Sequence, residues 1–316
     1  MAHFRVLISA PHLLGSLQRF RPLLEANGVE AVVPVTQERL DEAALLPLVT
    51  DIDGVICGDD AFTARVLAAA PNLKVISKWG VGIDAIDLEA AAGRGIVVRN
   101  TPAALADPVA DTVLAYVLCF ARQVPWLDRN MKAGRWERLP ARALRECSLG
   151  VIGLGSIGRA VVRRAAAFGM KVLGCDIVPP DPAYVSETSL TVLALDDVLA
   201  HSDFVSLNTT LTPQTVHLIG AREVGLMRAN AVLINTARGG LVDEPALIDA
   251  LRSGRLGGAA LDVFEVEPLP PDSPLRGMDH VLLGPHAANA SPAAFERIHE
   301  LAIANLLEEL SRWKPG

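Results

Sequence analysis

Three polar residues in the second half of the chain directly follow apolar stretches. Arg238 follows "VLINTA", Glu267 ends "ALDVFEVE", and His286 follows "VLLGP". Because ligands bind at the carboxyl ends of parallel strands, these side chains can share one site. An imidazole, with an unperturbed pKa of about 6.5, donates and accepts protons, and a carboxylate beside it favours its charged form. A guanidinium binds a carboxylate through two hydrogen bonds and polarises a carbonyl. This set suits hydride exchange at a carbon that bears oxygen.

Each of these residues also has a purely structural interpretation. Arg238 can form a surface ion pair, Glu267 can be a solvated loop residue, and His286 can simply end a strand. What weighs against this alternative is the coincidence of all three types at strand ends in one chain.

The segment "LGVIGLGSIGRAVV" at 149–162 matches G-x-G-x-x-G through Gly153, Gly155 and Gly158. At a strand-to-helix turn, the first glycine permits the turn and the second lets a pyrophosphate approach the backbone. The third glycine lets the helix pack on the strand, and the helix N-terminus supplies N–H donors. Taken alone, the motif also fits a tight turn without a ligand.

A carboxylate further along strengthens the dinucleotide interpretation. The next apolar segment, "MKVLGCD", ends at Asp176, eighteen residues after Gly158. At that place a carboxylate accepts hydrogen bonds from the ribose diol of adenosine. The following "IVPPDP" contains no Arg or Lys to neutralise a 2′-phosphate, so the sequence predicts NAD rather than NADP.

Short β-branched segments alternate with helical ones along the whole chain, which predicts two doubly wound α/β units with parallel sheets divided near residue 100. The expected strands are 4–10, 30–35, 53–58, 73–80, 95–100, 148–153, 170–176, 203–208, 231–236, 258–263 and 280–284. The expected helices are 16–28, 41–49, 62–70, 86–93, 103–123 (with Pro102 in its first turn), 156–168, 195–201, 220–228 and 243–253.

Composition excludes several classes of partner. The net charge of −7 leaves no basic excess for nucleic acid or an anionic membrane surface, and the arginines gathered at 135–145 have acidic residues among and beside them, as on a solvated face. The apolar stretch at 113–121 is too short to span a bilayer, and the N-terminus does not resemble a signal peptide. The four scattered cysteines lack metal-binding spacing. They predict buried free thiols, no metal site and a cytoplasmic protein.

Nearly the whole chain resembles the D-isomer-specific 2-hydroxyacid dehydrogenases. The resemblance lies in "LGVIGLGSIGRAV", "NTARGGLVDE", "GGAALDVFEVEP" and "GPHAANAS", and also in "KWGVGIDAID" and "VVRNTPAALADPVADTVLA". It implies an NAD-dependent oxidoreductase that interconverts a D-2-hydroxy acid and its 2-oxo acid, with 3-phosphoglycerate, glycerate and hydroxypyruvate among the candidate substrates. It also implies a homodimer.

The resemblance implies roles for individual positions. Arg238 is expected to bind the substrate, Glu267 to be the partner carboxylate and His286 the acid/base. The residues expected to line the NAD site are Gly153, Gly155, Ser156, Ile157, Gly158, Asp176, Thr209, Thr236, Ala237, Arg238, Asp262, His286 and Asn289. The amides of Gly80, Val81 and Gly82 are expected to hold the substrate carboxylate.

The resemblance further implies a Rossmann NAD-binding domain (100–288) inserted into a flavodoxin-like catalytic domain (1–99 plus 289–316), to which a helix at 291–311 returns. Two rival functions stay open at this point: a non-enzymatic NAD-sensing scaffold and a phosphite-type dehydrogenase of the same fold.

Lys78, just before the Gly80–Gly82 segment, is a further candidate. Its ammonium can face the far end of a short acid and so favour a substrate with a second anionic group. The alternative is a solvated lysine at a strand end, because successive strand residues point to opposite faces.

Overall fold

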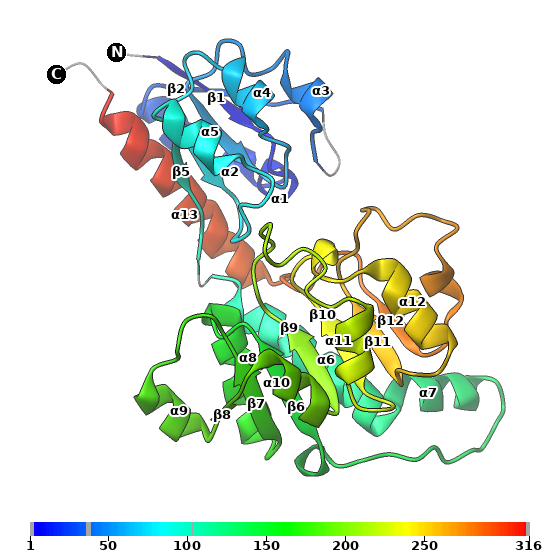
Figure 1. The fold of residues 1–316 in the computed structure, drawn as a ribbon. Coiled ribbons are helices and arrows are strands. Elements are labelled where there is room, and N and C mark those ends of the chain that lie inside the picture. Colours follow the sequence, from blue (N-terminus) through cyan, green and yellow to red (C-terminus); the bar gives the residue numbers. More distant parts are fainter. Residues whose placement is uncertain (1–2, 36–38, 103, 314–316) are drawn as a thin grey trace. The chain divides into compact units, whose positions relative to one another are not determined.

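A computed structural model describes residues 3–35, 39–102 and 104–313. The chain divides into two compact units, residues 1–105 with 291–316 (unit 1) and residues 106–290 (unit 2). Both are α/β units built on a parallel sheet, as the alternation of apolar and helical segments predicts (Figure 1). Within the described ranges, no helix is both long and apolar enough to cross a membrane.

Unit 1 is a five-stranded sheet in the order β2-β1-β3-β4-β5, the flavodoxin-like order. Its strands are β1 (Phe4–Ile8), β2 (Val29–Val32), β3 (Gly54–Cys57), β4 (Val75–Lys78) and β5 (Val97–Arg99). Its helices are α1 (Pro11–Leu14), α2 (Leu17–Ala26), α3 (Glu42–Leu45), α4 (Ala64–Ala68), α5 (Leu88–Gly93) and α13 (Pro292–Ser311).

Helix α13 comes from the other end of the chain and packs against β3, β4 and β5, beside the sheet in Figure 1. The Ser77 hydroxyl donates to the carbonyl of Ala302 (2.7 Å), and the Arg99 Nε donates to the nearly buried Glu309 carboxylate (2.9 Å). Unit 1 is therefore assembled from both termini.

Unit 2 is a seven-stranded parallel sheet in the order β12-β11-β10-β9-β6-β7-β8. Its strands are β6 (Ser148–Ile152), β7 (Lys171–Cys175), β8 (Thr191–Val192), β9 (Phe204–Leu207), β10 (Val232–Asn235), β11 (Gly258–Leu261) and β12 (Val281–Leu283). Its α-helices are α6 (Ala106–Arg122), α7 (Val124–Lys132), α8 (Ser156–Ala167), α9 (Pro182–Thr188), α10 (Leu195–His201), α11 (Ala221–Leu226) and α12 (Glu244–Arg252). Short 3₁₀ turns are η1 (Leu144–Glu146), η2 (Gly239–Leu241) and η3 (Pro274–Gly277).

The two faces of this sheet carry separate apolar cores. Helices α6 and α8 bury residues such as Val113 and Val161 on one face. Helices α10, α11 and α12 bury Val198, Val224 and Leu247 on the other. Strand order reverses between β6 and β9, and in such sheets ligands bind outside the carboxyl ends of the strands at that point.

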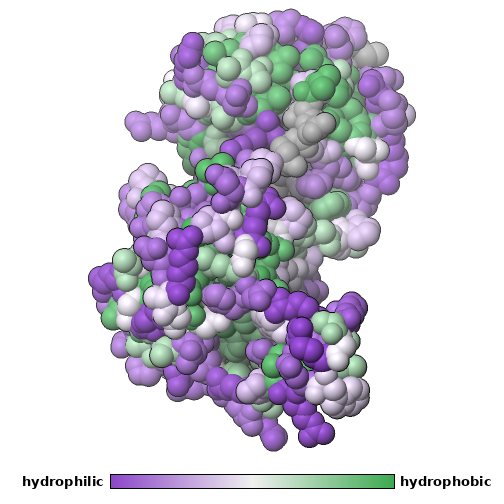
Figure 2. All heavy atoms as spheres, turned by 90° about the vertical axis from the view of Figure 1, so that its right-hand side faces the viewer, coloured by the Kyte–Doolittle hydropathy of each residue, from purple (hydrophilic) through white to green (hydrophobic). Residues whose placement is uncertain are grey.

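Three details of the sequence-based prediction were wrong. Helix α6 begins at Ala106, so Pro102 lies ahead of it and not in its first turn. Helices α1, α7 and α9 and the two-residue edge strand β8 were not predicted. Only Cys57 and Cys147 of the four free cysteines are fully buried, whereas Cys119 and Cys175 are partly exposed. The face shown in Figure 2 is largely hydrophilic, with smaller hydrophobic areas.

Candidate functional site

The glycine turn between β6 and α8 lies at the point where strand order reverses. Gly153 has φ of 91°, and a Cβ there would come within 2.7 Å of the Asn208 carbonyl oxygen, at the end of β9. A Cβ on Gly158 would lie 1.9 Å from the Gly153 oxygen. Around Gly155, by contrast, a Cβ would meet only open space within 4 Å. Gly153 and Gly158 are therefore required for packing. Gly155 leaves bare backbone at the helix N-terminus, where Ser156 and Ile157 begin α8.

Asp176 follows β7 and is exposed. Its carboxylate accepts hydrogen bonds from the amides of Leu154 (2.5 Å) and Val178 (2.9 Å), which tie it to the glycine turn. The next side chain, Ile177, is 99% exposed, so an apolar group stands beside the carboxylate where a 2′-phosphate would need a cation.

Two buried polar atoms near this edge have no hydrogen-bond partner among the described residues: Asn208 Oδ1 after β9 and Thr236 Oγ1 after β10. Thr209 is the next residue after Asn208, and Ala237 the next after Thr236. Buried polar atoms are normally satisfied, so each orphan marks a place where a ligand or water supplies the missing bond. With the open glycine and the exposed carboxylate, this edge fits a bound dinucleotide.

His286 and Glu267 form an ion-pair-type contact beyond the ends of β12 and β11. His286 Nδ1 lies 2.8 Å from Glu267 Oε2, and Oε1 of the same carboxylate accepts the amide of Phe264 (2.9 Å). Since a carboxylate only accepts, the imidazole carries its proton on Nδ1 when Glu267 is ionised. Both side chains are about one-third exposed, so they are reachable by solute.

The backbone of His286 is left-handed, with φ of 54°. A non-glycine residue held there costs of order 1–3 kcal/mol. The strain is maintained by bonds on both sides: the His286 amide donates to the Asp262 carbonyl (2.7 Å) and the Ala288 amide to the Asp262 carboxylate (2.7 Å).

Arg238 lies between β10 and η2, and its backbone is fixed by Asn235, whose side chain donates to the Arg238 carbonyl (2.8 Å) and accepts from the Ala237 amide (3.0 Å). A Cβ on Gly239 would lie 1.9 Å from the Phe264 carbonyl. The turn that carries Arg238 therefore packs directly on the segment that carries Glu267.

Asp262 directly follows β11, and burial raises the pKa of its carboxyl group even though the Ala287 and Ala288 amides donate hydrogen bonds to it, which lowers the pKa. Tyr116 of α6 faces the same carboxylate across Gly284, where a Cβ would meet both side chains. Burial, and next the charge of Asp262, raise the pKa of Tyr116 to about 12. Sequence patterns missed Tyr116 because it lies on an ordinary apolar helix. Asn289 follows His286 by three residues in the same loop.

A second group missed by the motifs supports the Phe264–Glu267 segment. Glu265 Oε1 lies 2.8 Å from His217 Nε2 and accepts the amide of Glu244 (3.3 Å). Three segments far apart in sequence meet at this carboxylate. In the sequence, the only sign of this group is that Glu265 lies between Asp262 and Glu267, close to the end of an apolar segment.

In unit 1, the segment Gly80–Gly82 follows β4. Gly80 has φ of 122°, and its amide donates to the Thr101 hydroxyl (3.0 Å), while the Asn100 side chain donates to the Val81 carbonyl (2.7 Å). The Gly80 amide is therefore engaged within the loop, and the Val81 and Gly82 amides have no acceptor among the described residues.

Lys78 is buried, 4% exposed, and not a solvated strand-end lysine. Its Nζ donates to the Trp79 carbonyl (2.9 Å) and lies 3.2 Å from Asp59 Oδ1. The ammonium is thus already paired with a carboxylate of the same unit.

Comparison with known proteins adds three lines of evidence. Residues 114–288 match the model of the D-isomer specific 2-hydroxyacid dehydrogenase, NAD binding domain. The chain is 41% identical over 278 residues to a glyoxylate reductase of Thermofilum pendens, covering 86% of this chain and 82% of that protein. It is 36% identical over 318 residues to a hydroxypyruvate reductase of Thermotoga maritima, covering 98% and 99%. Among solved structures, a D-lactate dehydrogenase of Aquifex aeolicus in complex with NAD and lactic acid superposes with a TM-score of 0.84 at 28% identity, covering 99% of this chain and 100% of that one.

Proposed function

We propose that this chain, which belongs to the D-isomer-specific 2-hydroxyacid dehydrogenase family and uses NAD, reduces glyoxylate and hydroxypyruvate to the corresponding 2-hydroxy acids. The observation that carries the proposal is the pairing of His286 with Glu267 at 2.8 Å on a segment packed against the turn of Arg238.

His286 is the proton donor in this proposal. Nδ1 faces Glu267, so the proton that reaches the nascent alkoxide leaves from Nε2, and in the reverse direction Nε2 takes it back. Glu267 fixes the ring orientation and stabilises the imidazolium form, and its second oxygen is held by the Phe264 amide. The left-handed backbone conformation of His286 accompanies the orientation in which its ring contacts Glu267.

Arg238 binds the substrate carboxylate and polarises the carbonyl that is reduced, because a guanidinium offers several N–H donors in one plane. As a separate proposal for unit 1, the amides of Val81 and Gly82, from which no described residue accepts a hydrogen bond, can hold a substrate carboxylate. Gly80 then acts by shaping the loop through its positive φ.

NAD, when bound, supplies or accepts the hydride. On the protein side, we assign the pyrophosphate to Gly155, Ser156 and Ile157, and the ribose diol to Asp176. Thr209, Thr236, Ala237, Asp262 and Asn289 line the nicotinamide half, where the orphaned Thr236 hydroxyl supplies a hydrogen bond.

The proposed preference of the enzyme for 2-oxo acids without a second anionic group rests on the environment of Lys78. A lysine paired with Asp59 and donating to a carbonyl offers little to a second anionic group, because its charge is already compensated. The test is a panel of glyoxylate, hydroxypyruvate, phosphohydroxypyruvate and pyruvate with NADH and NADPH, ranked by kcat/KM. A higher kcat/KM for phosphohydroxypyruvate than for hydroxypyruvate would overturn the substrate assignment, and Lys78→Ala would then show whether Lys78 is responsible.

The protein is further proposed to be a cytoplasmic homodimer. Apolar side chains on and just after α7 are unusually exposed, namely Val124 (55%), Met131 (52%) and Trp136 (83%), and such exposure is typical of a surface that another chain covers. Light scattering after size exclusion gives the mass, and Trp136→Asp should lower it if this surface forms the dimer.

A further inference from the structure

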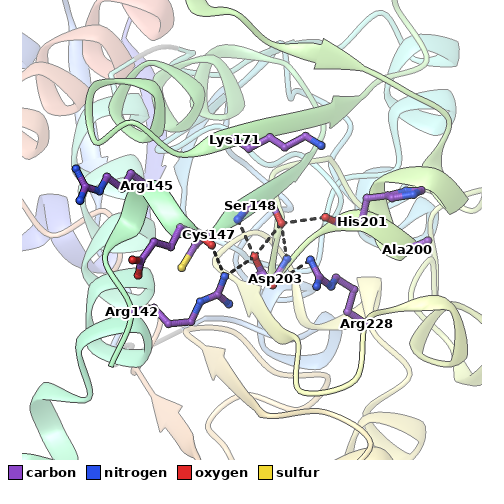
Figure 3. Close-up of a pocket in the computed structure, with 10 residues that line it drawn as sticks. Arg142, Arg145, Cys147, Ser148, Lys171, Ala200, His201, Asp203 and Arg228 are labelled. Carbon is purple, nitrogen blue, oxygen red and sulfur yellow. Dashed lines mark hydrogen bonds and ion pairs between the residues drawn. The ribbon is translucent and has the colours of Figure 1, made fainter. Parts of the chain in front are cut away.

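A hollow of ≈ 690 Å³ lies in unit 2 at the amino ends of β6, β7 and β9 (Figure 3). It is lined by Arg142, Arg145, Glu146, Cys147, Ser148, Lys171, Ala200, His201, Asp203 and Arg228. Ser148 and Lys171 are the first residues of β6 and β7, and Asp203 immediately precedes β9. The glycine turn follows the other end of β6, about 17 Å away at the usual rise of a strand, so this hollow is distinct from the dinucleotide site.

Asp203 forms the centre of the hollow and is fully compensated. In Figure 3, Arg142 and Arg228 approach it from opposite sides, each with a guanidinium nitrogen 3.2 Å from a carboxylate oxygen. The Ser148 amide (2.8 Å) and hydroxyl (3.0 Å) donate to the same carboxylate. The two guanidinium groups keep further N–H donors that Asp203 does not use.

The remaining charges of the lining are mostly positive. Lys171 and Arg145 form no ion pair with any described residue. Glu146 is the only other acid in the lining, and its carboxylate accepts the amide of Ala143 (2.7 Å). Four permanent cations therefore face two carboxylates, in a chain whose net charge is −7. Two of the arginines expected on a solvated face, Arg142 and Arg145, are exposed and lie beside cations from other segments.

We infer that this hollow binds a small polyanion, either phosphorylated or polycarboxylated. Clustered guanidinium and ammonium groups with spare donors recognise such oxyanions, and the guanidinium fork matches both phosphate and carboxylate. The volume lies within the usual range of small-molecule sites, so it admits more than a single phosphate. The position, at the amino ends of the strands, points to a ligand that is neither substrate nor cofactor.

The test titrates pyrophosphate and, separately, citrate into the protein by calorimetry at constant ionic strength, with stoichiometric NADH present to occupy the dinucleotide site. Lys171→Gln and Arg145→Gln each remove one charge from an exposed side chain with no described partner, so the fold should persist. Each should weaken binding about three- to tenfold. Lys132→Gln is the matched control, because it removes one exposed charge from α7, outside the hollow.

Saturable binding of either anion that both pocket variants weaken, and that the control retains, supports the site. The anion that binds more tightly identifies the phosphorylated or polycarboxylated class. Absence of binding at millimolar concentrations overturns the inference, and so does binding that Lys171→Gln and Arg145→Gln leave unchanged. Because the readout is binding and not turnover, the result is independent of the proposed reaction.

Discussion

Asp203 and Asp262 lie at opposite ends of the same parallel sheet, and the pKa values of their carboxyl groups are displaced in opposite directions. For Asp203, burial alone would raise the pKa, but bonds from Arg142 and Ser148 lower it below its usual value. For Asp262, burial raises the pKa and two backbone amides do not offset it, while nearby Glu267 raises it further. The carboxylate at the amino ends of the strands is thus compensated by its hydrogen-bond donors, whereas the carboxylate at the carboxyl ends is left undercompensated.

Some of the strained and unsatisfied groups of unit 2 lie on the carboxyl side of the sheet, although the left-handed Asn230 precedes β10 on the amino side. The left-handed His286 and the orphaned Thr236 hydroxyl both lie at the carboxyl ends of strands. Such features cost stability and persist where they serve a site. This contrast predicts that replacing His286 or Arg238 at the carboxyl ends reduces activity, whereas replacing Asp203 at the amino ends mainly lowers stability.

The largest effect is expected for His286→Ala, which removes the proton donor. We expect kcat at neutral pH to fall ~10²–10⁴-fold, the usual contribution of general acid catalysis, with NADH affinity almost unchanged. His280 provides a matched control, because it precedes β12 whereas His286 follows it. Steady-state kinetics of both variants decide the point: equal losses, or a loss below about fivefold for His286→Ala, contradict the assignment.

Arg238→Ala should raise KM for the 2-oxo acid and lower kcat together, because one guanidinium serves both binding and polarisation. A loss of roughly ten- to hundredfold or more in kcat/KM corresponds to one charged hydrogen-bonded contact. Arg238→Lys keeps the charge but loses the planar fork, so it should lie between the two proteins. An unchanged KM for the 2-oxo acid in Arg238→Ala would show that the arginine does not anchor the substrate.

The sequence predicts more of the carboxyl ends than of the amino ends, for a physical reason. Arg238, Glu267 and His286 directly follow apolar strands, and topology alone brings such ends together. The hollow around Asp203 combines residues from η1, β7, α10 and the turn before β10, and no local pattern joins them. Sequence spacing could not show that the Gly80 amide is used within its own loop, or that Lys78 is paired with Asp59.

The elements that sequence reasoning missed have equally local causes. Helix α7 is separated from α6 by a single residue, Gln123, in the left-handed conformation, and Pro125 in its first turn is typical in sequence of the end of a helix. Strand β8 has two residues, Thr191 and Val192, both exposed, and an exposed edge strand shows no apolar alternation.

A smaller effect concerns cofactor choice at the end of β7. Asp176→Ala combined with Ile177→Arg should shift the ratio of kcat/KM from NADH towards NADPH by about tenfold or more, since it removes a repelling carboxylate and adds a phosphate partner at an exposed position. The Asp176→Ala change alone separates lost repulsion from gained attraction. Equal use of both cofactors by the natural protein would contradict the premise.

The smallest expected effect concerns the pH dependence of stability, which directly compares Asp203 with Asp262. Because the folded pKa of Asp203 is lowered, its carboxylate stabilises the fold above the unfolded pKa of about 3.9 and loses that contribution as pH falls through the folded value. The raised pKa of Asp262 has the opposite sign: the folded state binds its proton more tightly, so stability from this group falls as pH rises from about 3.9 through the folded value. Asp203→Asn should therefore lower the free energy of unfolding at pH 7 by about 1–3 kcal/mol and flatten the loss of stability below pH ~4. Asp262→Asn should instead remove a decrease in stability that begins at about pH 3.9 and continues through the folded pKa of Asp262. Urea unfolding across this pH range measures both, and parallel pH profiles for the two variants would mean that the ends of the sheet do not differ in charge compensation.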